Sequence, residues 1–162
     1  MKERPEIVVI GCGNPYAGDD AAGIAVVEAL QKSAPTELCL RLMHDLGAAF
    51  LCDAHERASI VIIVDAVKSG APIGTLHFCR FPSNSVVARS SQRVSTHSLG
   101  LEKEIALAST CGECPKVFLL GIEIGDHCNG ESLSSPVTVA VEKAVVNFAD
   151  FCASARWQPN PG

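Results

Sequence analysis

Three residues of this sequence, Asp20, Asp65 and His97, carry side chains that together could bind a metal ion. Asp20 follows the glycine-rich segment GCGNPYAGD, which begins at Gly11. Asp65 directly follows the apolar run Ile60–Val64, and His97 lies at the predicted start of a helix. Two carboxylates and one imidazole leave coordination positions open and suit a divalent first-row metal. Such a site could polarise a carbonyl group or activate a water molecule.

Each acidic residue also has a simpler structural interpretation. Asp19 is expected to be the N-cap of the helix that follows, because aspartate is a favoured capping residue. Asp20 is harder to explain in this way, since a second adjacent carboxylate adds like-charge repulsion unless a cation offsets it. Asp65 could start the next turn, and His97 could be an ordinary surface residue. The three residues gain significance only if the fold brings them together.

The pattern of apolar residues predicts an α/β domain that would do so. Apolar runs predict five strands, over Glu6–Gly11, Glu37–Met43, Ile60–Ala66, Thr75–Phe81 and Lys116–Glu123. Helical patterns between and after them predict helices over Asp20–Ser33, Ala48–Arg57, Ser98–Ser109 and about Ser135–Ala153. This alternation predicts a three-layer fold with a mainly parallel, twisted sheet of about five strands and helices on both faces. Ligands bind such sheets beyond the C-terminal ends of the parallel strands.

One strand is expected to run against the others. Thr75–Phe81 follows Ile60–Ala66 too closely for a helical crossover, so it is predicted to turn back as an antiparallel strand. Pro82–Thr96 is serine-rich without a clear period and is expected to be a surface loop.

Length and charge exclude several classes of protein. The 162 residues are predicted to form a single domain, 1–162. Its 13 basic and 18 acidic residues give a net charge of −5, and the basic residues form no cluster, so nucleic acid is not an expected partner. No apolar run approaches the roughly 20 residues of a membrane helix, so no membrane association is expected and a cytoplasmic location is predicted.

The glycine-rich segment does not fit a nucleotide-binding motif. A dinucleotide fingerprint that starts at Gly11 and Gly13 requires a third glycine where Tyr16 stands. The segment also lacks the Gly-Lys-Ser/Thr ending of a phosphate-binding loop. Nucleotide binding is therefore poorly supported.

The remaining polar candidates carry weaker signals. The eight cysteines are predicted to be reduced and mostly buried. Cys111 and Cys114 form one C-x-x-C pair, which could belong to a zinc or redox site but is more simply two free thiols. Cys12 could be a nucleophile, although filling apolar space is the favoured role. Glu123 lies either at the active edge or in solvent, and the solvated position is favoured.

Several motifs in order resemble one enzyme family. GCGNPYAGDDAAG resembles the G-x-G-N-x-x-x-x-D-E-G-x-G opening of the nickel-iron hydrogenase maturation endopeptidases. VDAV with GAPIGT, and then THSLGL, resemble the second and third motifs of that family. LLGIEI is similar to its late strand, so the resemblance extends from about Ile7 to Val145.

The resemblance implies a peptidase that removes a C-terminal peptide from the precursor of a hydrogenase large subunit after nickel insertion. It also implies that Asp20, Asp65 and His97 are metal ligands and catalytic residues. Nickel would come with the precursor, and another divalent metal such as zinc is possible in the isolated protein. Asp20 could act as a ligand or as a base, and these roles stay open.

The sequence departs from the family pattern in two places. Asp20 stands where the family has Glu, and Ala21 stands where it commonly has Gly. HDLGAAFL matches the family's D-G-G-T-x-G segment only loosely, which suggests an unusual partner. Two alternatives remain: a chaperone that binds the nickel-loaded precursor without cleaving it, and a small-molecule hydrolase or nucleotide-binding domain.

Overall fold

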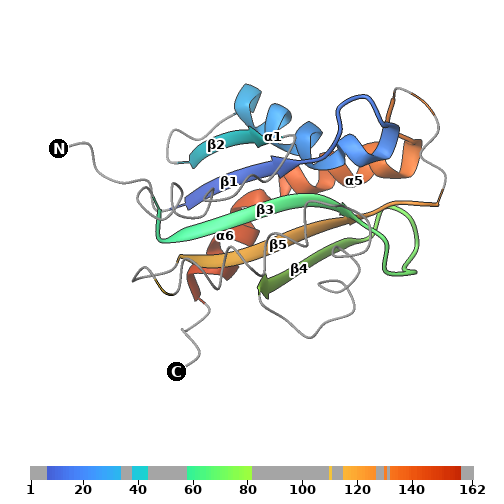
Figure 1. The fold of residues 1–162 in the computed structure, drawn as a ribbon. Helices are drawn as coiled ribbons and strands as arrows, with labels where there is room; N and C mark the ends of the chain where they lie inside the picture. The colour runs from blue at the N-terminus through green and yellow to red at the C-terminus, as the bar shows by residue number, and fades with distance from the viewer. Residues whose placement is uncertain are drawn as a thin grey trace.

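The protein is built on one mixed five-stranded sheet (Figure 1). The computed structural model describes residues 7–33, 38–43, 58–81, 110, 115–126, 130 and 132–157. The strands are β1 (Ile7–Cys12), β2 (Leu38–Met43), β3 (Ile60–Val67), β4 (Leu76–Phe81) and β5 (Lys116–Glu123). Their order is β2-β1-β3-β5-β4, and only the β4–β5 pair is antiparallel. The mainly parallel sheet with one antiparallel strand is therefore confirmed.

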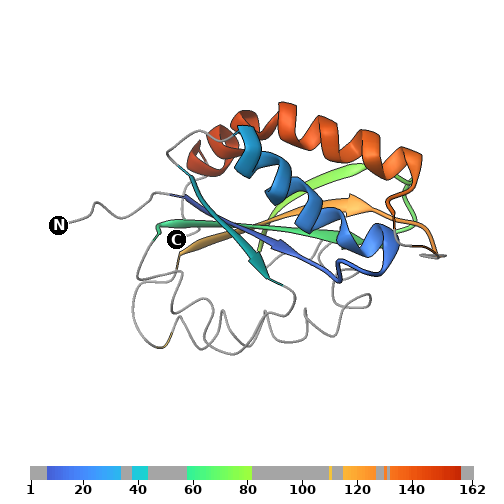
Figure 2. The same cartoon turned by 90° about the horizontal axis from the view of Figure 1, so that it is seen from above.

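Helices pack on one face of this sheet (Figure 2). They are η1 (Gly18–Ala21), α1 (Ala22–Ser33), α5 (Ser135–Val146) and α6 (Phe148–Trp157). The predicted helices Ala48–Arg57 and Ser98–Ser109 and the predicted loop Pro82–Thr96 lie outside the described residues.

The predicted C-terminal helix is two helices rather than one. It breaks at Asn147, whose side-chain nitrogen donates a hydrogen bond to the carbonyl oxygen of Lys143 at 2.8 Å. An asparagine side chain that competes for a helix carbonyl favours such an interruption. Phe148 resumes the helix immediately and is buried, so the apolar face continues across the break.

Buried residues cover both faces of the central strands. The helix-covered face contributes alternate residues to the main core, among them Val9, Ile62, Val64, Phe118 and Leu120. The opposite face is equally buried at Val8, Ile10, Val61, Ile63, Val117 and Leu119. This explains why β1, β3 and β5 are continuous apolar runs instead of alternating ones.

A close backbone contact fixes the start of α1 against the sheet. A side-chain carbon at Gly23 would lie 2.1 Å from the carbonyl oxygen of Val64 and 2.6 Å from that of Cys12. Only glycine allows the helix to approach both strands this closely. The packing therefore fixes η1, and with it Asp20, beside the ends of β1 and β3.

Cys12, Cys79 and Cys152 form no disulfide among the described residues, and Cys12 and Cys152 are buried. Cys111 and Cys114 lie outside the described residues. None of the helices in the described part of the chain has the length and hydropathy needed to span a bilayer.

Candidate active site

The C-terminal ends of β1, β3 and β5 lie at one edge of the sheet, as their parallel registers require (Figure 1). The segment 13–21 leaves β1 at this edge, and the loop 68–75 leaves β3 there. The first turn of α5 also lies at this edge (Figure 1). Asp20 lies in the first of these segments, and Asp65 lies near the end of β3, just before the second.

Asp20 lies in η1 and helps to shape the segment after β1. Its Oδ2 accepts a hydrogen bond from the backbone N–H of Asn14 at 2.9 Å. The side chain of Asn14 in turn accepts one from the backbone N–H of Tyr16 at 3.0 Å. Asp20 is half-buried, and its Oδ1 accepts no hydrogen bond from the described residues. Oδ1 of Asp20 therefore has no protein donor among the described residues.

The chain approaches itself closely at Gly13. This residue has a φ of +137°, and a side-chain carbon there would lie 1.9 Å from the carbonyl oxygen of Asp20. Glycine is required both by the backbone conformation and by the lack of space. The motif glycine thus folds the segment back onto Asp20.

Asp65 lies inside β3, two residues before the strand ends at Val67, and thus within the predicted strand Ile60–Ala66. Its side chain is buried, and its Oδ1 accepts a hydrogen bond from the backbone N–H of Ala66 at 2.8 Å. Asp65 pairs in register with Gly121 of β5, a residue with no side chain to cover the carboxylate.

Cys12 is the neighbour of Asp65 on β1, because Gly11 and Val64 are register partners and each is followed by one of these residues. Burial raises the pKa of the Cys12 thiol well above its usual value, and the Asp65 carboxylate raises it further. A buried neutral thiol is a poor nucleophile. The structure therefore favours the apolar filling role over the nucleophilic one.

The structure places two of the three predicted ligands at one edge. Asp65 lies in the buried strand β3, two residues before its end, and η1, which carries Asp20, packs against β3. His97 lies outside the described residues. Within the described ranges, no set of three His, Cys, Asp or Glu side chains gathers closely enough to hold a metal.

Asp19 does not cap its own helix, so that prediction is wrong. The residue before η1 is Ala17, with no side-chain capping bond. Asp19 is buried and accepts hydrogen bonds from the backbone N–H of Ser134 at 2.7 Å and from its hydroxyl at 2.8 Å. Ser134 is the N-cap residue of α5, so Asp19 joins η1 to the start of that helix.

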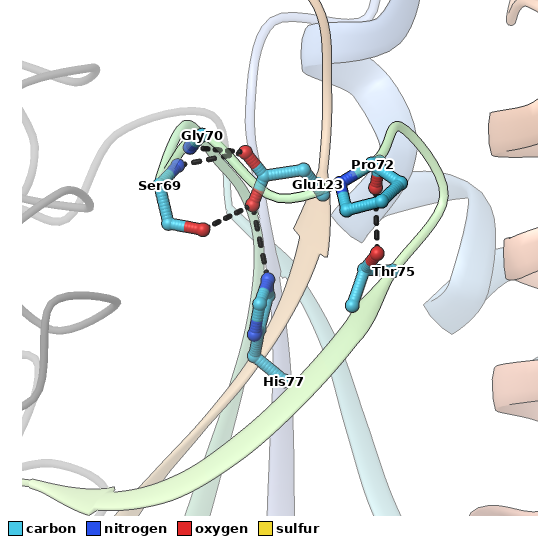
Figure 3. Close-up of polar contacts among 6 residues, drawn as sticks. All are labelled: Ser69, Gly70, Pro72, Thr75, His77 and Glu123. Atoms are coloured by element: carbon cyan, nitrogen blue, oxygen red, sulfur yellow. Dashed lines mark hydrogen bonds and ion pairs between the residues drawn. The ribbon is translucent and has the colours of Figure 1, made fainter.

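Glu123 is buried, and the prediction that it is solvated is wrong. Its residue is only 1% exposed and its carboxylate accepts several hydrogen bonds (Figure 3). Oε1 accepts from the backbone N–H groups of Ser69 at 2.7 Å and Gly70 at 3.1 Å. Oε2 accepts from the Ser69 hydroxyl at 2.7 Å and lies 3.0 Å from Nε2 of His77.

These contacts control the charge of Glu123. Burial by itself raises the pKa of the carboxyl group, but the hydrogen bonds from Ser69, His77 and Gly70 outweigh it, so the pKa lies below its usual value. A buried carboxylate is stable when donors satisfy it in this way. The sequence could have indicated this, because a charged residue at the end of a continuous apolar strand needs hydrogen-bond partners.

Glu123 and Asp65 project from the same face of the sheet. Asp65 pairs with Gly121 and Val67 pairs with Glu123 in the parallel β3–β5 ladder. His77 pairs with Gly121 from the antiparallel side. Because paired residues share a face and alternate residues along a strand do too, the three polar side chains lie on the face opposite the described helices.

A comparison with protein families assigns this chain to one of them. The family model described as hydrogenase maturation protease, HycI, matches residues 24–151. The chain belongs to the hydrogenase maturation protease family. It is therefore a peptidase that acts in hydrogenase maturation, and the predicted family is confirmed.

Relatives of this hydrogenase maturation protease support the assignment. Hydrogenase expression/formation protein HupD from Thiocapsa roseopersicina is 31% identical over 96% of this chain and 73% of its own length. Hydrogenase 2 maturation protease from Escherichia coli K12 is 32% identical, over 70% of this chain and 70% of its own. The solved structure of hydrogenase maturating endopeptidase HybD from Escherichia coli is 26% identical, with a TM-score of 0.73 over 92% of this chain and 93% of that one.

Proposed function

We propose that this hydrogenase maturation protease removes a C-terminal peptide from the precursor of a nickel-iron hydrogenase large subunit after nickel insertion. The observation that carries this proposal is that Asp20, in η1, and Asp65, near the end of β3, lie at one edge of the sheet. One oxygen of Asp20 has no donor among the described residues. Nickel belongs to the substrate in this proposal, held by the precursor when it meets the enzyme.

Asp20, Asp65 and His97 would contact the metal. Two carboxylates and an imidazole are a donor set that suits a divalent first-row metal. Asp20 offers its Oδ1, while its Oδ2 is fixed by the backbone N–H of Asn14. Asp65 is oriented by the backbone N–H of Ala66. Such backbone contacts orient carboxylate ligands before the metal arrives.

Each part of the chain has a distinct task in cleavage. When bound, the metal would supply Lewis-acid polarisation of the scissile carbonyl or an activated water molecule. Asp65 is buried and shielded from solvent. Asp20 is only half-buried, so it is accessible enough to act as a base as well. Asp20 thus has two compatible roles, as ligand and as base.

The test is mass spectrometry of a large-subunit precursor, prepared with and without nickel, after incubation with the protein. The parent protein should shorten the nickel-loaded precursor only. Asp20→Asn and Asp65→Asn should lower the cleavage rate by about 100-fold or more. Both amides keep one oxygen for the backbone N–H of Asn14 or Ala66, but they remove the charge and replace the second oxygen by an NH2 group.

Two further variants sharpen the result. Asp20→Glu keeps the charge and lengthens the side chain, so it should retain cleavage that Asp20→Asn loses. Asp150→Asn is the matched control, because it removes one carboxylate from the exposed surface of α6. A nickel-loaded precursor that binds the parent protein but stays intact would contradict the proposal. Equal rates for the parent and Asp65→Asn would remove Asp65 from the site.

A further inference from the structure

Two large apolar side chains are exposed on the loops at the active edge. Tyr16, on the segment after β1, is 85% exposed, and Ile73, on the loop after β3, is 48% exposed. The other exposed large apolar residues of the described chain are on helices α5 and α6: Val139, Val146 and Trp157. Single exposed apolar residues are ordinary. The shared position of Tyr16 and Ile73 on the two loops that border Asp20 and Asp65 is what needs an explanation.

The loop that carries Tyr16 is held by the site itself. The Asp20 carboxylate binds the backbone N–H of Asn14, and the side chain of Asn14 binds the backbone N–H of Tyr16. Gly13 brings the backbone against Asp20 on the other side. The backbone of Tyr16 is therefore linked to Asp20, a predicted metal ligand, through Asn14 and two successive hydrogen bonds.

The loop that carries Ile73 is held by Glu123 (Figure 3). The Glu123 carboxylate binds the N–H groups of Ser69 and Gly70 at the start of the loop. The main chain of Glu123 binds its end, accepting from the N–H of Gly74 and donating to the carbonyl of Thr75, each at 2.9 Å. The hydroxyl of Thr75 closes the turn on the carbonyl oxygen of Pro72 at 2.6 Å.

We propose that Tyr16 and Ile73 contact the hydrogenase precursor next to its scissile peptide bond. This inference rests on the proposed function, which brings that bond to Asp20 and Asp65. The occupant is an extended apolar stretch of the precursor, because a tyrosine ring and a branched aliphatic side chain gain free energy by covering apolar surface. Tyrosine is also among the residues that carry most of the binding energy at protein interfaces.

The rigidity of both loops supports contact with a partner. Apolar side chains on a mobile loop can fold back onto their own protein, whereas these backbones are fixed by buried or half-buried carboxylates. Binding to a preformed surface avoids the entropy cost of ordering a loop. Glu123 is in this respect a positioning residue, which acts on the substrate through Ile73.

The test measures binding and cleavage separately. Nickel-loaded precursor is titrated against the parent protein, Tyr16→Ser, Ile73→Ser and the double variant, and the kcat and KM of shortening are determined for each. Val146→Ser and Trp157→Ser are matched controls, because they remove exposed large apolar side chains from α5 and α6, away from the two loops. Melting temperatures of all variants show that each one is folded.

Each single substitution at the edge should weaken binding and raise KM by about fivefold or more, with kcat nearly unchanged. The two control variants should match the parent. Binding by Tyr16→Ser and Ile73→Ser that equals parental binding would overturn the inference even if the parent cleaves normally. A parent that binds but does not cleave, with binding still weakened by the two substitutions, would support the inference and defeat the proposed function.

Discussion

The carboxylate of Asp19 accepts two hydrogen bonds from Ser134, a residue 115 positions later in the chain. Ser134 is the N-cap of α5, and Asp19 lies in η1 next to Asp20. The contact therefore fixes the segment that carries a predicted ligand against the first turn of a helix. Of the two adjacent aspartates, Asp19 joins η1 to α5, and Asp20 binds the backbone of Asn14 through one oxygen.

Replacing Asp19 should destabilise the whole fold. Asp19→Ala leaves two donors of Ser134 without their buried acceptor, so the free energy of unfolding should fall by about 2–4 kcal/mol. Ser134→Ala keeps the backbone N–H bond and should cost only about 1 kcal/mol. Urea unfolding of both variants measures these values. An Asp19→Ala protein as stable as the parent would show that the contact contributes nothing.

Glu123 should make the free energy of unfolding depend on pH in the acidic range. Its pKa is lowered in the folded protein, so its contribution is fully present above the ordinary glutamate value of about 4.3. That contribution is lost as the pH falls through the lowered folded value. The difference in unfolding free energy between the parent and Glu123→Gln should be constant near neutral pH and shrink below about pH 4.

Urea titrations at several pH values test this, with Glu142→Gln as the control. Glu142 is exposed on α5, and its loss should change the unfolding free energy at pH 7 by less than about 0.5 kcal/mol. A parent–Glu123→Gln difference that grows on acidification would contradict the prediction.

A methyl group at Gly23 should not fit. In Gly23→Ala the new carbon would meet two backbone carbonyl oxygens, at 2.1 and 2.6 Å, neither of which can rotate away. The variant should lose about 3 kcal/mol or more of stability, or fail to fold. Gly125→Ala is the comparison, because its new carbon meets only the flexible end of Ile73, at 3.0 Å. Similar melting temperatures for the two variants would refute the close-packing argument.

Cys12 should be dispensable for chemistry. Its side chain is buried at the end of β1, where burial keeps the thiol neutral. Cys12→Ala should retain the parental cleavage rate within about threefold while losing about 1 kcal/mol of stability through the smaller side chain. A folded Cys12→Ala protein with a 100-fold lower rate would instead indicate a nucleophile.

The sheet was predictable because its signals are local. The continuous apolar runs of β1, β3 and β5 and the short connection before β4 predict a mixed sheet correctly. The break at Asn147 escaped prediction because Val137, Val141 and Val145 lead to Phe148 with uninterrupted helical spacing. A one-residue interruption leaves that apolar pattern intact.

The polar side chains at the edge were less predictable, because their partners are distant in sequence. Asp19 has local capping preferences, but its partner Ser134 is named only by the folded structure. Glu123 binds Ser69, 54 residues away, and His77, 46 residues away. For Asp20 and Asp65 the positions at strand ends were sufficient, since the parallel topology alone brings those ends to one edge.

The first turn of α5 touches both loops of the active edge: Ser134 binds Asp19, and the backbone of Pro136 lies against Gly74. Both loops are made early on the ribosome, and their shared support is made much later. Because contacts between distant parts of the chain form more slowly than local ones, we expect this edge to assemble late in folding. A nascent chain that ends before Ser134 therefore has both carboxylates but lacks the helix turn that supports the two loops around them.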